Sequence, residues 1–545
     1  MKRLFLIFFL LVSTLSFAQQ KGLFFNKKEY VPTTLLTFSK AKDSLPQPVY
    51  DENPLWVETY WKAWEIIFKN FYEPNKANGF VSQYIDAAFN NNIFMWDASF
   101  MTMFCNYAYP IVPGIATLDN FYIKQYPNGE ICREISRGNG SDCEFWVNKK
   151  GEEFYSSWGY DVAKKREKTF IKYIDRELPS LPSFLTLDNM NHPIMAWAEI
   201  ESFKMTGDKT RLKMVYEPLK HQYTAFQKYS RQGNGLYMTD WASMDNSERN
   251  KYLEGGGMGI DISCEMVLFA RNLSQIAQLI GCSKDAKTFK NEANELAIII
   301  NKLMWSAKDK FYYDITVSGT QVGIKTVAAY WSLLSKVADP EQAASLATHL
   351  TNPLTFGRKN LVPTLSADEK EFSEFGDYWC GSVWAPTNTM VINGLENYGY
   401  NELSRKVALN HVALVANVFK KTGTIWENYS PDKKSQGFHK DGSAVMNDFV
   451  GWSGIGPIKL FIEYAIGLKA DAESNSIEWT ITSDKAVGCK NFRFNCNVIT
   501  LLADFSNKSN EIYIKALKPF VLKINFHGVE TKFKIKRGIQ LVKLE

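Results

Sequence analysis

The sequence predicts a mainly α-helical protein, built as a closed ring of helical hairpins that carries a small C-terminal β-sandwich. Two observations support this fold class. From about residue 55 to residue 468, apolar residues recur at helical spacing in paired segments, whereas 469–545 alternates apolar and polar residues and is rich in β-branched side chains. A chain of 545 residues also exceeds the size of a usual single core, which favours one large domain and one smaller one.

The helical segments follow one another as hairpins. Apolar positions in 55–72 are three and four residues apart, and 97–112 predicts a second helix. Residues 193–230 predict two helices joined by a turn at 206–208, because glycine ends helices and aspartate caps them. Hairpins of the same kind are predicted at 260–305, 326–350 and 385–423. Successive hairpins that each bury one face on a neighbour predict a closed ring.

The rest of the chain divides around this ring. Residues 1–18 predict a signal peptide and 19–54 an N-terminal arm. The main domain, expected to be catalytic, spans 55–468, and within it 113–190 is polar, glycine-bearing and irregular, which predicts an insertion over one end of the ring. Residues 469–545 predict the β-sandwich domain.

The N-terminus predicts export. MKRLFLIFFLLVSTLSFAQQ has a basic start, an apolar run and a small-residue end, which is typical of a signal peptide cut after Ala18. The mature chain is therefore expected in the periplasm or outside the cell, with no membrane span. Removal of Lys2 and Arg3 lowers the formal net charge from +5 to +3, and no basic run suggests nucleic acid as a partner.

Metals and cofactors are not indicated. The chain has no CxxC motif and only 6 His residues, at wide spacing, so no zinc site and no cofactor are expected. The sequence does not decide whether a structural calcium is bound, because scattered loop acids give no coordination pattern. Export permits disulfides, and the sequence neighbours Cys132–Cys143 and Cys489–Cys496 are candidate pairs.

Five stretches of odd composition lie between the helices. They are IFMWDASFMTMF (93–104), NMNHPIMAWAEI (189–200), TDWASMDNSERN (239–250), GDYWCGSVWAPTNTMVINGLENYGY (376–400) and TGTIWENYSPDKKSQG (422–437). In this order, and over roughly 55–468, they resemble the (α/α)6-toroid inverting glycosidases: trehalases, processing α-glucosidase I and mannosylglycerate hydrolase, a glycoside hydrolase family 63-like group.

This resemblance implies two catalytic carboxyls, whose spacing in inverting enzymes is about 6.5–9.5 Å to admit a water. The family's general acid matches Asp245 in WASMDNSER, and its general base matches Glu427 in WENYSPD. Without the resemblance, Asp-Asn-Ser favours a turn or cap residue at Asp245, and Glu427 is an ordinary loop acid. A proton held by Asp245 requires apolar surroundings, for which Trp241 and Met244 are candidates.

The resemblance also implies substrate contacts. Asp97 of the Trp96-Asp97 pair either binds sugar hydroxyls or caps the following helix. Asn191 and His192 stand where relatives often have Gln-Pro-Pro, which leaves the sugar identity open. The remaining candidate substrate-binding residues are Trp241, Asn246, Tyr378, Trp379 and Trp384.

Tryptophan is abundant, with 15 residues, and a Trp ring either fills the core or stacks on a sugar. Three arginines, Arg133, Arg137 and Arg249, are either plain surface residues or partners of an anionic sugar.

The sequence thus predicts an exo-acting inverting glycosidase on α-linked oligosaccharides, of open oligomeric state. One alternative is a lyase or dehydratase on uronic-acid-containing oligosaccharides, with His192 as base and Arg133 or Arg137 as counter-charge. Another is an inactive carbohydrate-binding relative.

Overall fold

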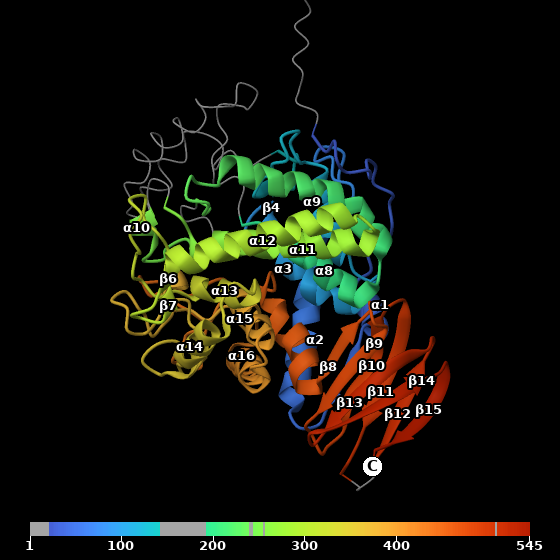
Figure 1. The fold of residues 1–545 in the computed structure, drawn as a ribbon. Helices are drawn as coiled ribbons and strands as arrows, with labels where there is room; N and C mark the ends of the chain where they lie inside the picture. The colour runs from blue at the N-terminus through green and yellow to red at the C-terminus, as the bar shows by residue number, and fades with distance from the viewer. Residues whose placement is uncertain (1–20, 142–191, 239–243, 254–256, 507–509, 545) are drawn as a thin grey trace, which may run out of the picture.

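The computed structural model describes residues 21–141, 192–238, 244–253, 257–506 and 510–544 (Figure 1). The predicted signal peptide and residues 142–190 of the predicted insertion lie outside these ranges. Within them, no helix has both the length and the apolar character needed to cross a membrane.

An inner ring of helices forms the centre of the described structure. Neighbours in the ring contact each other in the order α3 (Met95–Cys105), α8 (Met195–Thr206), α11 (Ile260–Ile280), α13 (Trp331–Leu334) and α15 (Ala385–Glu396). Helices η8 (Ser453–Ile455) and η9 (Gly456–Ile466) contact α3 and so close the ring, with η8 also touching α15. This closure is the toroid that the hairpin pattern predicts.

Partner helices surround this ring. They are α2 (Pro54–Ile67), α9 (Lys209–Tyr229), α12 (Ser283–Met304), α14 (Pro340–Thr351) and α16 (Asn401–Thr422). Composition explains the two positions: every residue of α3 is buried, whereas α12 buries a single stripe of Phe289, Ala293, Leu296, Ile300 and Met304. Figure 1 shows α12 lying along the outside of α11, its partner in the hairpin.

Short elements fill the connections. The helical turns are α1 (Phe38–Ala41), η1 (Lys42–Ser44), η2 (Phe68–Asn70), η3 (Asn106–Ala108), η4 (Gly114–Leu118), α4 (Asp119–Tyr122), α10 (Asn250–Leu253), η6 (Val327–Tyr330) and η7 (Tyr378–Cys380). Three small antiparallel pairs are β2 (Phe71–Tyr72) with β3 (Tyr84–Ile85), β4 (Asn92–Phe94) with β5 (Glu134–Ser136), and β6 (Trp305–Ser306) with β7 (Phe311–Tyr312).

Residues 113–141 differ from the irregular insertion expected there. Helix η4 is buried against α3, and β5 pairs with β4, the strand that leads directly into α3. The apolar residues of this segment therefore pack into the body of the toroid, and its polar composition hid that burial from pattern analysis.

The C-terminal strands form two packed sheets. One has the order β1 (Gln47–Tyr50), β10 (Val487–Phe494), β11 (Asn497–Ala503), β12 (Glu511–Ala516) and β15 (Gly538–Lys543). The other has the order β14 (Val529–Ile535), β13 (Phe520–Phe526), β9 (Ser476–Ile481) and β8 (Leu468–Asp471). Strand β1 comes from the N-terminal arm and pairs with β10, so the arm joins the sandwich just before α2 begins (Figure 1).

The predicted Cys489–Cys496 disulfide is absent, and both cysteines are free. Cys489 is a buried residue of β10, whereas Cys496 is exposed in the turn that follows this strand. Each strand residue advances the chain by about 3.3 Å, so the two Cα atoms lie beyond the roughly 7 Å that a disulfide can span. Cys143, of the other predicted pair, lies outside the described residues.

Trp384 is a core residue, which contradicts the cleft position that the resemblance implied for it. Its side chain is 0% exposed, and its ring stacks on Trp379 with centroids 4.4 Å apart. An edge contact with Tyr378 at 4.8 Å and a tilted contact with Trp452 at 5.4 Å enclose the other sides. Trp384 therefore supports the rings in front of it.

We predict that Trp384→Ala lowers the free energy of unfolding by about 3–5 kcal/mol, because the cavity left among three aromatic rings cannot collapse. Denaturant unfolding of the mature chain measures this. Trp305→Ala, at a half-buried Trp of β6, is the control and should cost clearly less. Equal stability of the Trp384 variant and the wild type, with weaker substrate binding, would return Trp384 to the cleft.

Candidate active site

The loop that carries Asp245 is stabilised by hydrogen bonds from a residue of the same loop. The Asn250 amide donates hydrogen bonds to the carbonyl of Met244 at 2.7 Å and to that of Asp245 at 3.1 Å. Met244 is buried beneath the loop, as expected for an apolar neighbour of the acid, while Asp245 keeps partial contact with solvent. Trp241 lies outside the described residues.

Arg249 anchors the same loop to the inner ring. Its side chain is 0% exposed and forms ion pairs with Asp261 at the start of α11 and, at 3.0 Å, with Asp314. Asp314 also accepts the backbone N–H of Ile260 at 2.8 Å, which fixes the first turn of α11. Arg249 is thus neither a surface residue nor a partner for an anionic sugar, because both carboxylates use its charge inside the protein.

His192 is likewise occupied within the protein. The ring is 2% exposed, and Nδ1 contacts the Glu265 carboxylate of α11. His192 is therefore paired with a carboxylate in the interior, and its expected contact with the sugar stays a prediction. Asn191 lies outside the described residues.

Asn246 joins the Asp245 loop to the segment 377–380. Its amide nitrogen donates to the Asp377 carbonyl at 3.0 Å, and its amide oxygen accepts the Trp379 N–H at 2.8 Å. The Cys380 thiol donates to the Asn246 carbonyl at 3.2 Å. Both ends of the amide bond to backbone groups, so Asn246 orients the loops, while its expected sugar contact stays a prediction. We call this set of hydrogen bonds the Asn246 clasp.

Glu427 is held in place by the segment 377–380, which the Asn246 clasp fixes. The Tyr378 hydroxyl donates to Glu427 Oε1 at 2.6 Å, and the Met446 N–H donates to Oε2 at 3.3 Å. The backbone is fixed as well, because the Glu427 carbonyl accepts the Trp452 indole N–H and the Ser453 hydroxyl, each at 3.0 Å. Tyr378, expected to contact substrate, thus holds the candidate base.

Backbone strain accompanies this contact. Asp377 and Tyr378 have φ values of 43° and 59°, in the left-handed region that side chains other than glycine rarely adopt. Such strain costs on the order of 1–3 kcal/mol per residue and persists where the surroundings enforce it. Here the Asn246 clasp on one side and the Tyr378–Glu427 hydrogen bond on the other enforce it.

Asp97 is the third carboxyl of the site. Helix α3 begins at Met95 with Phe94 as its cap, so Asp97 lies in the first turn and does not cap the helix. It is 6% exposed, and within the described structure nothing donates a hydrogen bond to its Oδ1. Trp96 Nε1 is also buried and has no hydrogen-bond partner within the described structure. A buried acceptor and donor without protein partners fit hydroxyl groups of a bound sugar.

The three carboxyls share one electrostatic environment. Burial raises the pKa of Asp97 to about 8, that of Asp245 to about 6 and that of Glu427 to about 7. The charge of Arg133 acts in the opposite direction on Asp97 and Asp245, whereas the charge of Asp245 further raises the pKa of both Asp97 and Glu427. Asp245 and Glu427 are therefore close enough to influence each other across one site.

Arg133 is the buried arginine beside these acids. It is 8% exposed, and its carbonyl accepts the Met95 N–H at 2.9 Å, which places it opposite the first turn of α3. Arg137, by contrast, pairs with Asp86 at 2.9 Å and stacks over Tyr72, away from the three carboxyls.

Aromatic rings form the wall of the site. Trp96 packs edge-on against Trp379 at 6.5 Å and against Trp452 at 6.0 Å. Trp452 was not among the residues expected from the sequence, although GWSGIGP (451–457) has a Trp among glycines just before the last inner helix, which is a signal of close packing. Among the described residues, no group of three or more His, Cys, Asp or Glu side chains could hold a metal ion.

Part of the chain matches a known family. Residues 186–444 match the family described as the mannosylglycerate hydrolase MGH1-like glycoside hydrolase domain. An uncharacterized protein of Borreliella burgdorferi is 28% identical over 354 residues, which cover 63% of this chain and 74% of that protein. Mannosylglycerate hydrolase MGH1 of Selaginella moellendorffii is 26% identical over 200 residues, which cover 35% of this chain but only 38% of that relative.

The fold has a solved counterpart. The crystal structure of the GH63 mannosylglycerate hydrolase of Thermus thermophilus in complex with glucose aligns with a TM-score of 0.54 at 17% identity, over 73% of this chain and 98% of that chain. This likeness confirms the predicted toroid. The fold is thus that of the (α/α)6-toroid glycoside hydrolases, and the match of residues 186–444 to an MGH1-like glycoside hydrolase domain indicates a glycosidase similar to the GH63-like group.

Proposed function

We propose that the protein is an exported, exo-acting inverting glycosidase that cleaves α-linked oligosaccharides, with Asp245 and Glu427 as its acid and base. The observation that carries this proposal is that the charge of Asp245 raises the pKa of the buried Glu427, with pKa values of about 6 for Asp245 and about 7 for Glu427. A pair with such values holds one proton near neutral pH, and inversion requires one protonated and one ionised carboxyl. The signal-peptide pattern of residues 1–18 supports the export.

The resemblance assigns the acid to Asp245 and the base to Glu427. The pKa order of the free site is the opposite: burial raises both values, but the charge of Arg133 lowers the pKa of Asp245, whereas the charge of Asp245 raises that of Glu427. Electrostatics in the free site thus favours a second candidate mechanism with the two roles exchanged. Hydrogen bonding favours the first, since the Tyr378 hydroxyl donates to Glu427 and stabilises its ionised form.

The other two interpretations of the sequence have less support. An elimination would use His192 as base, but this ring is buried against Glu265. A non-catalytic binding protein needs no carboxyl pair with raised pKa values, and unpaired burial of acids is costly. A screen of the mature chain should include nitrophenyl glycosides, natural oligosaccharides and mannosylglycerate, which the names of matched relatives give as a substrate.

Substitution of the two carboxyls separates the two assignments. Asp245→Asn should lose on the order of 10²–10⁴-fold in kcat on natural glycosides, because the leaving oxygen is no longer protonated. It should keep much more activity on a glycosyl fluoride or dinitrophenyl glycoside, which departs without acid help. Glu427→Gln should be inactive on both kinds of substrate, because the attacking water has no base.

Steady-state rates on the matched substrates measure this, and circular dichroism checks that each variant is folded. The reverse pattern, in which only the Glu427 variant is restored by the activated substrate, would assign the acid to Glu427. Full activity of both variants would exclude the pair from the chemistry.

We further predict a narrow, bell-shaped pH profile of kcat/KM with its maximum near about pH 6.5. Below about 6 both carboxyls are protonated and the base is lost, and above about 7 both are ionised and the acid is lost. Initial rates from about pH 4 to about pH 9, with roughly one point per half unit, define both limbs. A profile that stays flat across this range would show that these groups do not titrate in the rate-limiting step.

A further inference from the structure

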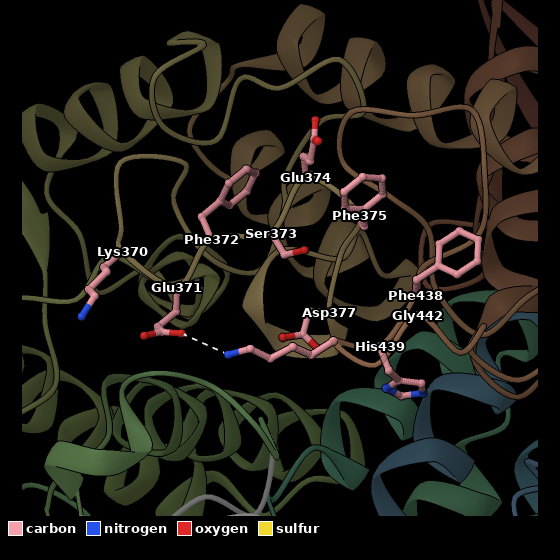
Figure 2. Close-up of a pocket in the computed structure, with 11 residues that line it drawn as sticks. Lys370, Glu371, Phe372, Ser373, Glu374, Phe375, Asp377, Phe438, His439 and Gly442 are labelled. Atoms are coloured by element: carbon pink, nitrogen blue, oxygen red, sulfur yellow. Dashed lines mark ion pairs between the residues drawn. The ribbon is translucent and has the colours of Figure 1, made fainter.

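A second pocket lies beside the loop that carries Tyr378. It has a volume of about 680 Å³ and is formed by the segments 370–377 and 438–442 (Figure 2). This volume lies in the range of about 300–1,000 Å³ that is usual for small-molecule sites. None of the predicted site residues lines it, and the chemistry described above does not use it.

The walls of this pocket are preformed. The Asp377 N–H donates to the Phe438 carbonyl at 2.9 Å, and the Phe438 N–H donates to the Phe375 carbonyl at 3.2 Å, which joins the two segments. The Glu371 carboxylate forms an ion pair with Lys440 at 3.9 Å across the pocket (Figure 2). A ligand would therefore bind with little ordering of the loops.

The side chains suit a neutral sugar. Phe375 is 49% exposed and has Lys433 Nζ 5.6 Å from its ring centroid, a contact that holds the ring at the rim. The same pocket is lined by the carboxylates of Glu371, Glu374 and Asp377 and by the donors of Lys370, His439 and Lys440. The apolar ring and these polar groups offer stacking and hydroxyl contacts, and three carboxylates against two lysines give the pocket no preference for an anion.

The pocket adjoins the candidate catalytic site at Tyr378. Asp377 lines the pocket, and the next residue, Tyr378, donates a hydrogen bond to Glu427. The His439 ring lies 5.4 Å from the Tyr378 ring, so the two segments that form the pocket both contact the residue that holds the candidate base.

We propose that this pocket binds a sugar unit of the substrate that lies beyond the two units joined by the reacting bond. The proposal rests on the proposed glycosidase function and adds to it that the substrate is a neutral oligosaccharide longer than a disaccharide. Occupation of the pocket would tether the chain and raise the effective concentration of the reacting bond at the carboxyl pair.

The test compares substrates of different length. The wild type is assayed on a nitrophenyl monoglycoside and on the di-, tri- and tetrasaccharide with the same non-reducing sugar and linkage. We expect kcat/KM to rise from the disaccharide to the longer chains. In Phe375→Ala, the ratio of kcat/KM for the tetrasaccharide to kcat/KM for the monoglycoside should fall about tenfold, which corresponds to the loss of one stacking contact. Leu541→Ala, an equally conservative change at an exposed apolar residue of β15 in the sandwich, should leave this ratio as in the wild type.

Two outcomes would overturn the inference while the glycosidase function stands. One is a wild type that cleaves the disaccharide as fast as the tetrasaccharide. The other is a Phe375 variant that loses the same factor on all substrates, since this would indicate a disturbed Tyr378 and no bound sugar. A wild type that cleaves none of the glycosides would instead refute the proposed function itself. Thermal unfolding confirms that the Phe375 variant is folded.

Discussion

The Asn246 clasp is the contact on which the site depends. One amide bridges two loops that are 131 residues apart in the chain, and it brings the Asp245 backbone to the segment whose Tyr378 holds Glu427. The hydrogen bonds go to backbone groups, so they fix the loops whatever the neighbouring side chains are. Arg249 secures the other end of the Asp245 loop to α11 through two buried carboxylates. The loops of the two candidate catalytic carboxyls are thus fixed to each other and to the ring, which is how separate loops can hold a fixed carboxyl spacing.

Burial of three carboxyls in one site is costly, and the structure compensates for it unequally. Arg133 offsets the charge of Asp97 and Asp245, while Glu427 is compensated by the Tyr378 hydroxyl and the Met446 N–H. The remaining desolvation keeps all three pKa values above their usual range. That cost is useful, because a proton that is retained near neutral pH is available to a leaving group.

The sequence predicted the helical hairpins well, since their apolar spacing is a local signal: the break at Gly281 and Cys282 lies between α11 and α12, as expected. It also selected Asp245, Glu427 and Asp97, which the structure brings into one electrostatic environment. It could not predict the roles of Asn246, Arg249 or His192, because their partners lie far along the chain and leave no local pattern.

Trp384 was misplaced for a related reason: in YWCGSVWAP two Trp residues face the same region, and only packing shows that Trp379 covers Trp384. The four residues of β1 were too few to reveal that the arm joins the sandwich.

The most direct test of the account is the anomeric configuration of the first product. A water activated by one carboxyl attacks the sugar from the face opposite the leaving group, so ¹H NMR of the reaction, recorded before mutarotation, should show a product of configuration opposite to that of the substrate. A first product with retained configuration would contradict the account, because retention requires one of the carboxyls to bond to the sugar itself.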